Sequence, residues 1–82
     1  MEQSFEANFS VLVMSVASSA AMSMGLAANP QTGKTEKDKN MAKFNIDLLV
    51  MLKNKTINNL TTEEKHFIDS IVSDLQMKFV HM

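Results

Sequence analysis

The sequence contains no cysteine, arginine, tryptophan or tyrosine among its 82 residues. Without cysteine, the chain can form neither a disulfide nor a thiolate metal site. Its eight basic residues are all lysines, dispersed among nine acidic residues, and its net charge is −1. Nucleic-acid binding usually needs a concentrated basic face, often with arginine or stacking aromatic residues. We therefore expect no disulfide framework and no nucleic-acid partner.

The length bounds the architecture as firmly as the missing residue types do. Eighty-two residues make a single domain, 1–82, near the lower end of self-sufficiency. A core of this size seldom contributes more than roughly 3–5 kcal/mol unless something staples it. Because 45% of the residues are hydrophobic, we expect a folded chain rather than a disordered one.

Charge is also missing from one long segment, 7–32. A secretion signal would start with a basic region, but Glu2 and Glu6 precede this segment and no lysine does. A membrane span would be less diluted by serine and would carry aromatic or basic anchors at its ends. We therefore interpret the segment as a helix covered by protein, with membrane association through this helix as the alternative. The diluting serines are Ser10, Ser15, Ser18, Ser19 and Ser23.

Helical periodicity predicts a first helix over 4–25, with Ser4 as N-cap and Gly25 just beyond its end. At 100° per residue, one face of this helix is apolar and should pack inward, flanked by Val13 and Met24. The residues of that face are Phe5, Phe9, Leu12, Val16 and Ala20.

The opposite face of this helix carries Val11, Met14 and Met22, where a monomeric surface helix should be charged. A ridge of serines four residues apart would let another backbone approach closely. Burial against a second copy is the commonest solution for such a face. We predict a homo-oligomer, with a dimer favoured, while an unknown protein partner remains possible. The predicted self-association face comprises Val11, Met14, Ser15, Ser18, Ser19 and Met22.

The loop that follows, 26–37, contains the turn signals Asn29-Pro30 and Thr32-Gly33. The segment 28–35 fits A-x-x-x-x-G-K-T, which differs from the phosphate-binding loop by its first glycine. That loop belongs between a β-strand and a helix, whereas a helix is predicted here on the N-terminal side. We expect no nucleotide site.

A second helix is predicted over 38–57. Apolar residues cover most of its circumference, and only Lys43, Asp47 and Asn54 form a polar wedge. A helix that is apolar nearly all round is typically buried. It should contact both other helices and another subunit.

The third helix is predicted over 62–80, with Thr61 and Glu64 as a capping box. Asn58 or Asn59 can adopt the left-handed conformation that ends the second helix. The second and third helices should therefore form an antiparallel hairpin. The apolar stripe of the third helix is Phe67, Ile68, Ile71, Val72, Leu75 and Phe79.

No catalytic or metal-binding constellation emerges from the polar residues. Glu63 and His66 form a single E-x-x-H, whereas di-iron bundles use two such pairs directed inward. His66 projects away from the apolar stripe, so we expect it to face solvent. We predict that the protein is not an enzyme and that it binds no cofactor and no metal.

Four blocks in order resemble one bacterial family, the domain-of-unknown-function family 1844. They lie in 9–21, 29–34, 46–56 and 59–64, and the closing D-L-x-M-x-F-V adds to them. The chain departs from the family pattern at Asn29, Asn58, Gln76 and Phe79, where Asp, Gly, Arg and Tyr are common. The resemblance covers nearly the whole chain and implies a cytoplasmic protein, but it brings no established activity and no site residues.

Together these observations predict an all-α protein of three helices. Its function is most consistent with a non-enzymatic module that associates with itself or with another protein.

Overall fold

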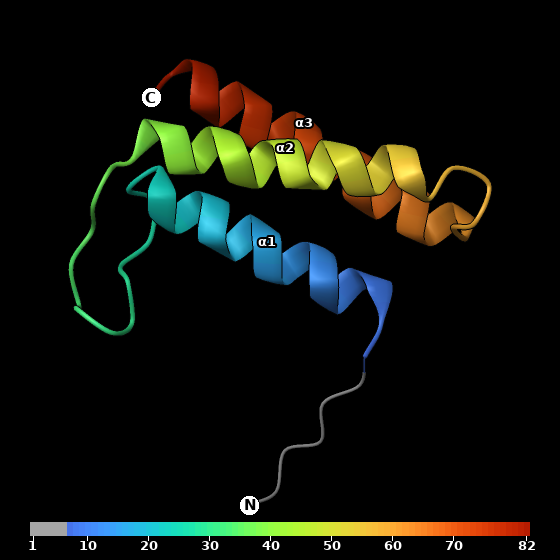
Figure 1. The fold of residues 1–82 in the computed structure, drawn as a ribbon, viewed down its shortest axis with the longest axis horizontal. Coiled ribbons are helices and arrows are strands. Elements are labelled where there is room, and N and C mark those ends of the chain that lie inside the picture. The colour runs from blue at the N-terminus through green and yellow to red at the C-terminus, as the bar shows by residue number, and fades with distance from the viewer. Residues whose placement is uncertain (1–6) are drawn as a thin grey trace, which may run out of the picture.

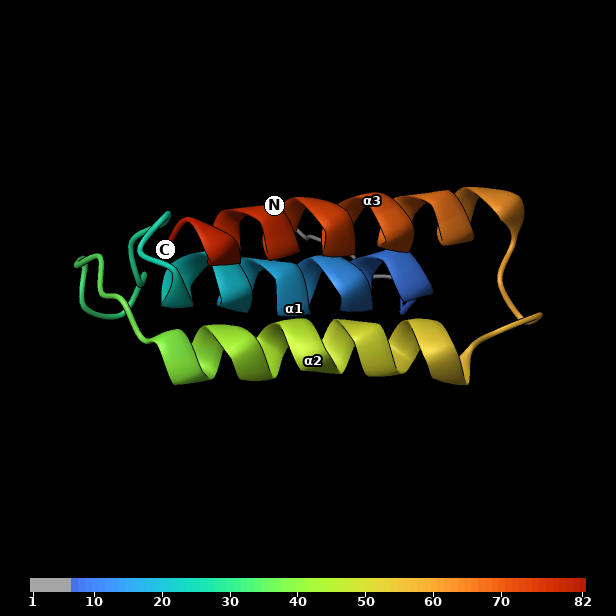
Figure 2. The same cartoon turned by 90° about the horizontal axis from the view of Figure 1, so that it is seen from above.

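The computed structural model describes residues 7–82, which form three α-helices: α1 (Phe9–Ser23), α2 (Lys39–Lys55) and α3 (Thr62–Val80). In Figure 1, α1 lies beneath α2 and α3, and in the turned view of Figure 2 it lies between them. Consecutive helices run in opposite directions, so the fold is a three-helix bundle with α2 and α3 as an antiparallel hairpin. Within 7–82 there is no β-strand beyond an isolated bridge between Met24 and Lys37. The predicted all-α class is confirmed.

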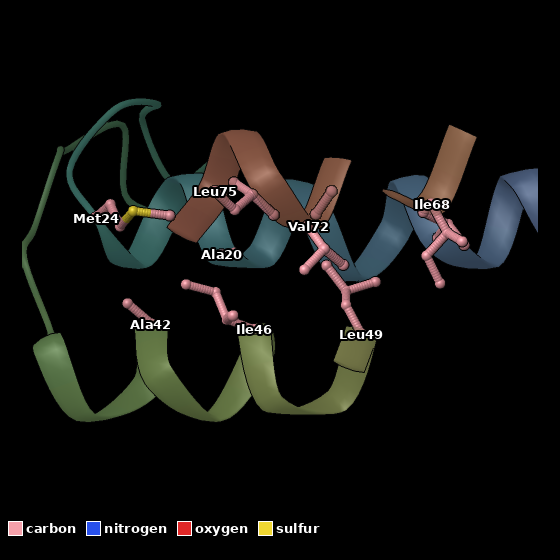
Figure 3. Close-up of a cluster of buried hydrophobic side chains, with 10 residues drawn as sticks. Ala20, Met24, Ala42, Ile46, Leu49, Ile68, Val72 and Leu75 are labelled. Carbon is pink, nitrogen blue, oxygen red and sulfur yellow. The ribbon is translucent and has the colours of Figure 1, made fainter. Parts of the chain in front are cut away.

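All three helices contribute to one core, which fills the space between them (Figure 3). From α2, Leu49 points toward Val72 of α3, and both side chains are buried. The part contributed by α1 is built from small residues, since Ala17 and Ala20 accompany Val13 there. The buried apolar residues are Val13, Ala17, Ala20, Met24, Ala42, Ile46, Leu49, Ile68, Val72 and Leu75.

α3 begins where the capping motif predicts. The Glu64 backbone N–H donates to the Thr61 hydroxyl (3.1 Å), and the Thr61 backbone N–H donates to the Glu64 carboxylate (2.9 Å). These two bonds satisfy donors that a helix start leaves unpaired. The predicted stripe is confirmed as well: three of its residues are in the core and Phe67, Ile71 and Phe79 pack against it.

α1 starts later than the sequence predicts. Its N-cap is Asn8, whose side-chain oxygen accepts from the Val11 backbone N–H at 2.8 Å. Asparagine is among the best N-cap residues, because its short side chain can reach the free donors of the first turn. The predicted N-cap Ser4 lies outside the described residues.

The buried face of α1 is also rotated from the predicted one. Leu12, placed inside by periodicity, is 46% exposed, whereas the flanking residue Val13 is fully buried. Consecutive residues lie about 100° apart around a helix, so a bundle that buries Val13 leaves Leu12 toward solvent. The residues of α1 that are buried are Val13, Ala17 and Ala20, and short side chains of this kind let helix backbones approach each other closely.

The end of α1 follows the prediction for Gly25. This glycine has a φ of +76°, and the next backbone N–H, of Leu26, donates to the Ala21 carbonyl at 2.9 Å. This is the Schellman arrangement, which favours glycine because only glycine adopts positive φ without steric cost. A Cβ at this position would also lie 2.9 Å from Cγ of Lys37.

α2 is capped by Asp38, whose carboxylate accepts from the Met41 backbone N–H at 3.0 Å. As predicted, α2 packs against both α1 and α3. Its polar wedge is exposed, and Lys43 and Asp47 form an ion pair of 2.8 Å there. The turn into α3 contains Asn58 with a φ of +70°, so of the two predicted candidates, Asn58 and Asn59, the first adopts the left-handed conformation.

Candidate functional site

The predicted self-association face is on α1, and its N-terminal part is open to solvent. Val11 is 48% exposed and Met14 is 46% exposed. Together with Ser15 and Ser18, which are exposed as well, they line a shallow depression. No charged residue lies within α1, so this depression is uncharged, with Val11 and Met14 as its apolar residues and Asn8, Ser10, Ser15 and Ser18 as its polar ones.

The C-terminal part of the predicted face lies in a different place. Ser19 and Met22 are half-buried and line a second depression, which α1 shares with Met41 and Asn45 of α2. The structure therefore divides the predicted set in two: four residues face outward from α1, and two face the groove between α1 and α2.

The serine ridge of α1 consists of Ser15, Ser19 and Ser23. The hydroxyl groups of Ser15 and Ser23 donate hydrogen bonds within the helix. The Ser15 hydroxyl donates to the Val11 carbonyl at 2.9 Å, and the Ser23 hydroxyl donates to the Ser19 carbonyl at 2.8 Å. Because such bonds to the preceding turn occupy the hydroxyl proton, an apolar surface can pack on Ser15 without leaving its donor unpaired. At the other end of the ridge, α2 itself makes the close approach to Ser23.

That approach is made by Asn45, the buried polar residue of the described chain, which is 7% exposed. Its side-chain amide donates to the Met41 carbonyl at 3.0 Å and lies 3.4 Å from the Ser23 hydroxyl. Buried amides are costly unless they are hydrogen-bonded, so this contact ties α2 to α1. The periodicity of the sequence did not distinguish Asn45 from its apolar neighbours.

The outward side of α2 is exposed in the single chain, so the predicted contact of this helix with another subunit stays a prediction. Phe44 is 55% exposed, and Met41 and Met51 are exposed to a similar degree. Leu48, between them, is half-buried. The physical reason is geometric: two neighbouring helices cover only part of a helix circumference, so the remaining apolar residues face solvent. In the sequence, the lack of polar residues on this side of α2 was the feature that pointed to an additional apolar surface.

The loop that resembles a phosphate-binding motif is organised around Asn29. Its carbonyl accepts from the backbone N–H groups of Thr32 (3.2 Å) and Gly33 (2.7 Å), and its side-chain oxygen accepts from Gln31 (2.8 Å). These donors are therefore turned toward Asn29 rather than toward a shared anion position. The motif also follows a helix, α1, instead of the β-strand that a phosphate-binding loop requires.

The E-x-x-H pair lies on the outer side of α3. His66 is exposed, as predicted, and Glu63 is exposed in the first turn. Among residues 7–82, no group of three or more His, Asp or Glu side chains is arranged to hold a metal ion. Within the same residues, no helix has both the length and the apolar character needed to cross a membrane.

Comparison with known protein families shows to which family the chain belongs. The family described as "Domain of unknown function (DUF1844)" matches residues 6–81. The three-helix chain therefore belongs to this family, as its sequence blocks indicate. No curated protein and no solved structure matches it significantly.

Proposed function

We propose that the protein is a non-enzymatic module that self-associates, most simply as a dimer, through the exposed face of α1. The observation that supports this proposal is the apolar, charge-free surface at Val11 and Met14. Soluble monomers rarely leave contiguous apolar patches in water. A second copy is the partner we favour because an isologous interface pairs the same patch with itself and needs no other protein.

The test is the mass in solution. Light scattering at tens of micromolar should give about twice 9.1 kDa for the wild type, and Met14→Glu should return it to the monomer mass. A charge at Met14 would have to be desolvated in the interface, which is strongly unfavourable without a partner. Met22→Glu should act in the same direction.

Met77→Glu is the matched control, because Met77 is 63% exposed but lies on α3. It should leave the mass unchanged. A monomeric wild type, or a mass that neither Met14→Glu nor Met22→Glu changes, would contradict the proposal. Sedimentation of the monomer with neutral phospholipid vesicles would instead favour membrane association through α1.

A further inference from the structure

A cavity of about 400 Å³ lies where α2 turns into α3. In Figure 1 this turn, 56–61, is at the end of the bundle opposite the loop 26–37. Small-molecule sites commonly have volumes of roughly 300–1,000 Å³, and the space between the helices of a bundle is one of the places where they form. We call this space the turn cavity; its size admits a small organic molecule.

Part of the lining of the turn cavity is apolar. It includes Ile68 of α3, which is fully buried, and Leu60, which packs against the core. Ile57 also lines the cavity and is 64% exposed. Because covering an exposed apolar side chain removes surface from water, the binding of a ligand with an apolar body would be favourable here.

Two of the charged residues that line the turn cavity compensate each other. Nζ of Lys53 in α2 lies 3.0 Å from Oδ1 of Asp69 in α3, and that oxygen is buried. No donor in the described residues forms an aligned hydrogen bond with it, so the contact is an ion pair only. The pair links α2 to α3 at the cavity, and a ligand meets it as a group without net charge.

The remaining charged residue of the lining is Lys65, which is exposed near the start of α3. Its ammonium group forms no ion pair with any residue of 7–82. Glu63 and Glu64 precede it in the helix but do not line the turn cavity, and the Glu64 carboxylate accepts from the Thr61 backbone N–H. The turn cavity therefore carries one uncompensated positive charge.

Amide groups add hydrogen-bond donors to this positive charge. Asn54 and Asn58 line the turn cavity with exposed side chains, and each side-chain amide has two N–H donors. An ammonium group and amide donors beside an apolar lining match a carboxylate on an apolar body. Inorganic phosphate would match less well, because it would leave Ile57 and Leu60 uncovered and bring a second negative charge to a cavity that contains Asp69.

We propose that the turn cavity binds a small carboxylic acid in its anionic form. The carboxylate lies at Lys65, and the apolar body packs against Ile57 and Leu60. This inference is independent of the proposed self-association, because no residue of the self-association face of α1 lines the turn cavity. The outcome of either test therefore leaves the other unchanged.

The test is a titration of the full chain with phenylacetate, followed by the nuclear magnetic resonance signals of the backbone amides. Phenylacetate should shift the signals of 57–60 and 65–69 saturably, with a dissociation constant of about 1–5 mM, which is typical of a ligand of this size. Phenylacetamide has the same apolar body without the charge and should bind at least about threefold more weakly. No saturable shift at these positions, or equal affinities for the acid and the amide, would overturn the inference.

Two lysine variants locate the charge that the carboxylate meets. Lys65→Gln should weaken the binding of phenylacetate about threefold and remove its advantage over phenylacetamide. Lys55→Gln is the matched control, because Lys55 is exposed at the end of α2 and does not line the turn cavity. Both side chains are exposed, so the amide spectra should show an intact fold for each variant. Equal losses for the two variants would indicate general charge attraction and would overturn the inference.

Discussion

α1 and α3 contribute similarly to the core but differ in their outer surfaces. Each supplies several buried side chains to the same cluster. On its outer side, α3 carries acidic and basic residues, including the 2.9 Å pair between Asp74 and Lys78. α1 carries no charged residue on any side. The two helices therefore differ in what their outer surfaces can bind and not in how they stabilise the core.

α2 lies between these two types of surface. Its wedge around Lys43 and Asp47 resembles the outer side of α3, while its stripe around Phe44 resembles α1. The boundary between a hydrated surface and an apolar one thus runs along a single helix. Substitutions in the buried core of α2 and on its exposed side can therefore be compared within one helix.

The largest effect on folding should come from Leu49 of α2, and its neighbour Leu48, about 100° away around the helix, provides the comparison. Leu49 is fully buried and Leu48 is half-buried on the outer stripe. Leu49→Ala should lower the free energy of unfolding by about 2–5 kcal/mol, since it leaves a cavity in the core. At concentrations where the chain is monomeric, urea unfolding should show a clearly smaller loss for Leu48→Ala. Equal losses would mean that the two sides of α2 are not distinct.

An intermediate effect is expected at the start of α3. Thr61→Ala removes the hydroxyl that accepts from Glu64, so it should lower the free energy of unfolding by about 0.5–2 kcal/mol. Thr62→Ala, one residue further along, is the control and should change the urea midpoint much less. Neither substitution should alter the mass in solution, because both positions lie at the start of α3 and outside the proposed self-association face of α1.

The smallest effect should come from the charged side of α3. His66 is exposed, and His66→Ala should change the free energy of unfolding by less than about 0.5 kcal/mol. It should also leave the metal content and the mass in solution unchanged. A loss of bound metal on this substitution, measured by elemental analysis of the purified protein, would contradict the prediction of a metal-free protein.

The elements with strong local signals could be predicted from the sequence. Thr61 and Glu64 define the start of α3, and Gly25 and Asn58 adopt positive φ where the chain must turn. Each of these features depends on a few neighbouring residues and on backbone geometry. They could therefore be inferred without knowledge of the tertiary structure.

Features that depend on packing could not be predicted in the same way. For α1, the helical periodicity placed Leu12 on the inward face, whereas the bundle buries Val13 and Ala17 and leaves Leu12 exposed. For α2, the pattern showed too many apolar residues but not which of them two neighbours would leave exposed. The sequence therefore indicated the apolar residues on the outward face of α1, such as Val11 and Met14. It did not indicate that Phe44 of α2 would be exposed.

The contact between Asn45 and Ser23 bears on the handedness of the bundle. Three helices joined in sequence can form two mirror-image topologies, which bury similar apolar area and must be distinguished by specific interactions. In the alternative topology α1 would lie on the other side of α2, and Asn45 would lose the Ser23 hydroxyl while remaining buried. A buried asparagine is known to select one arrangement at some cost in stability. Asn45→Leu should therefore leave the helices intact while weakening the preference for the observed topology over its mirror image.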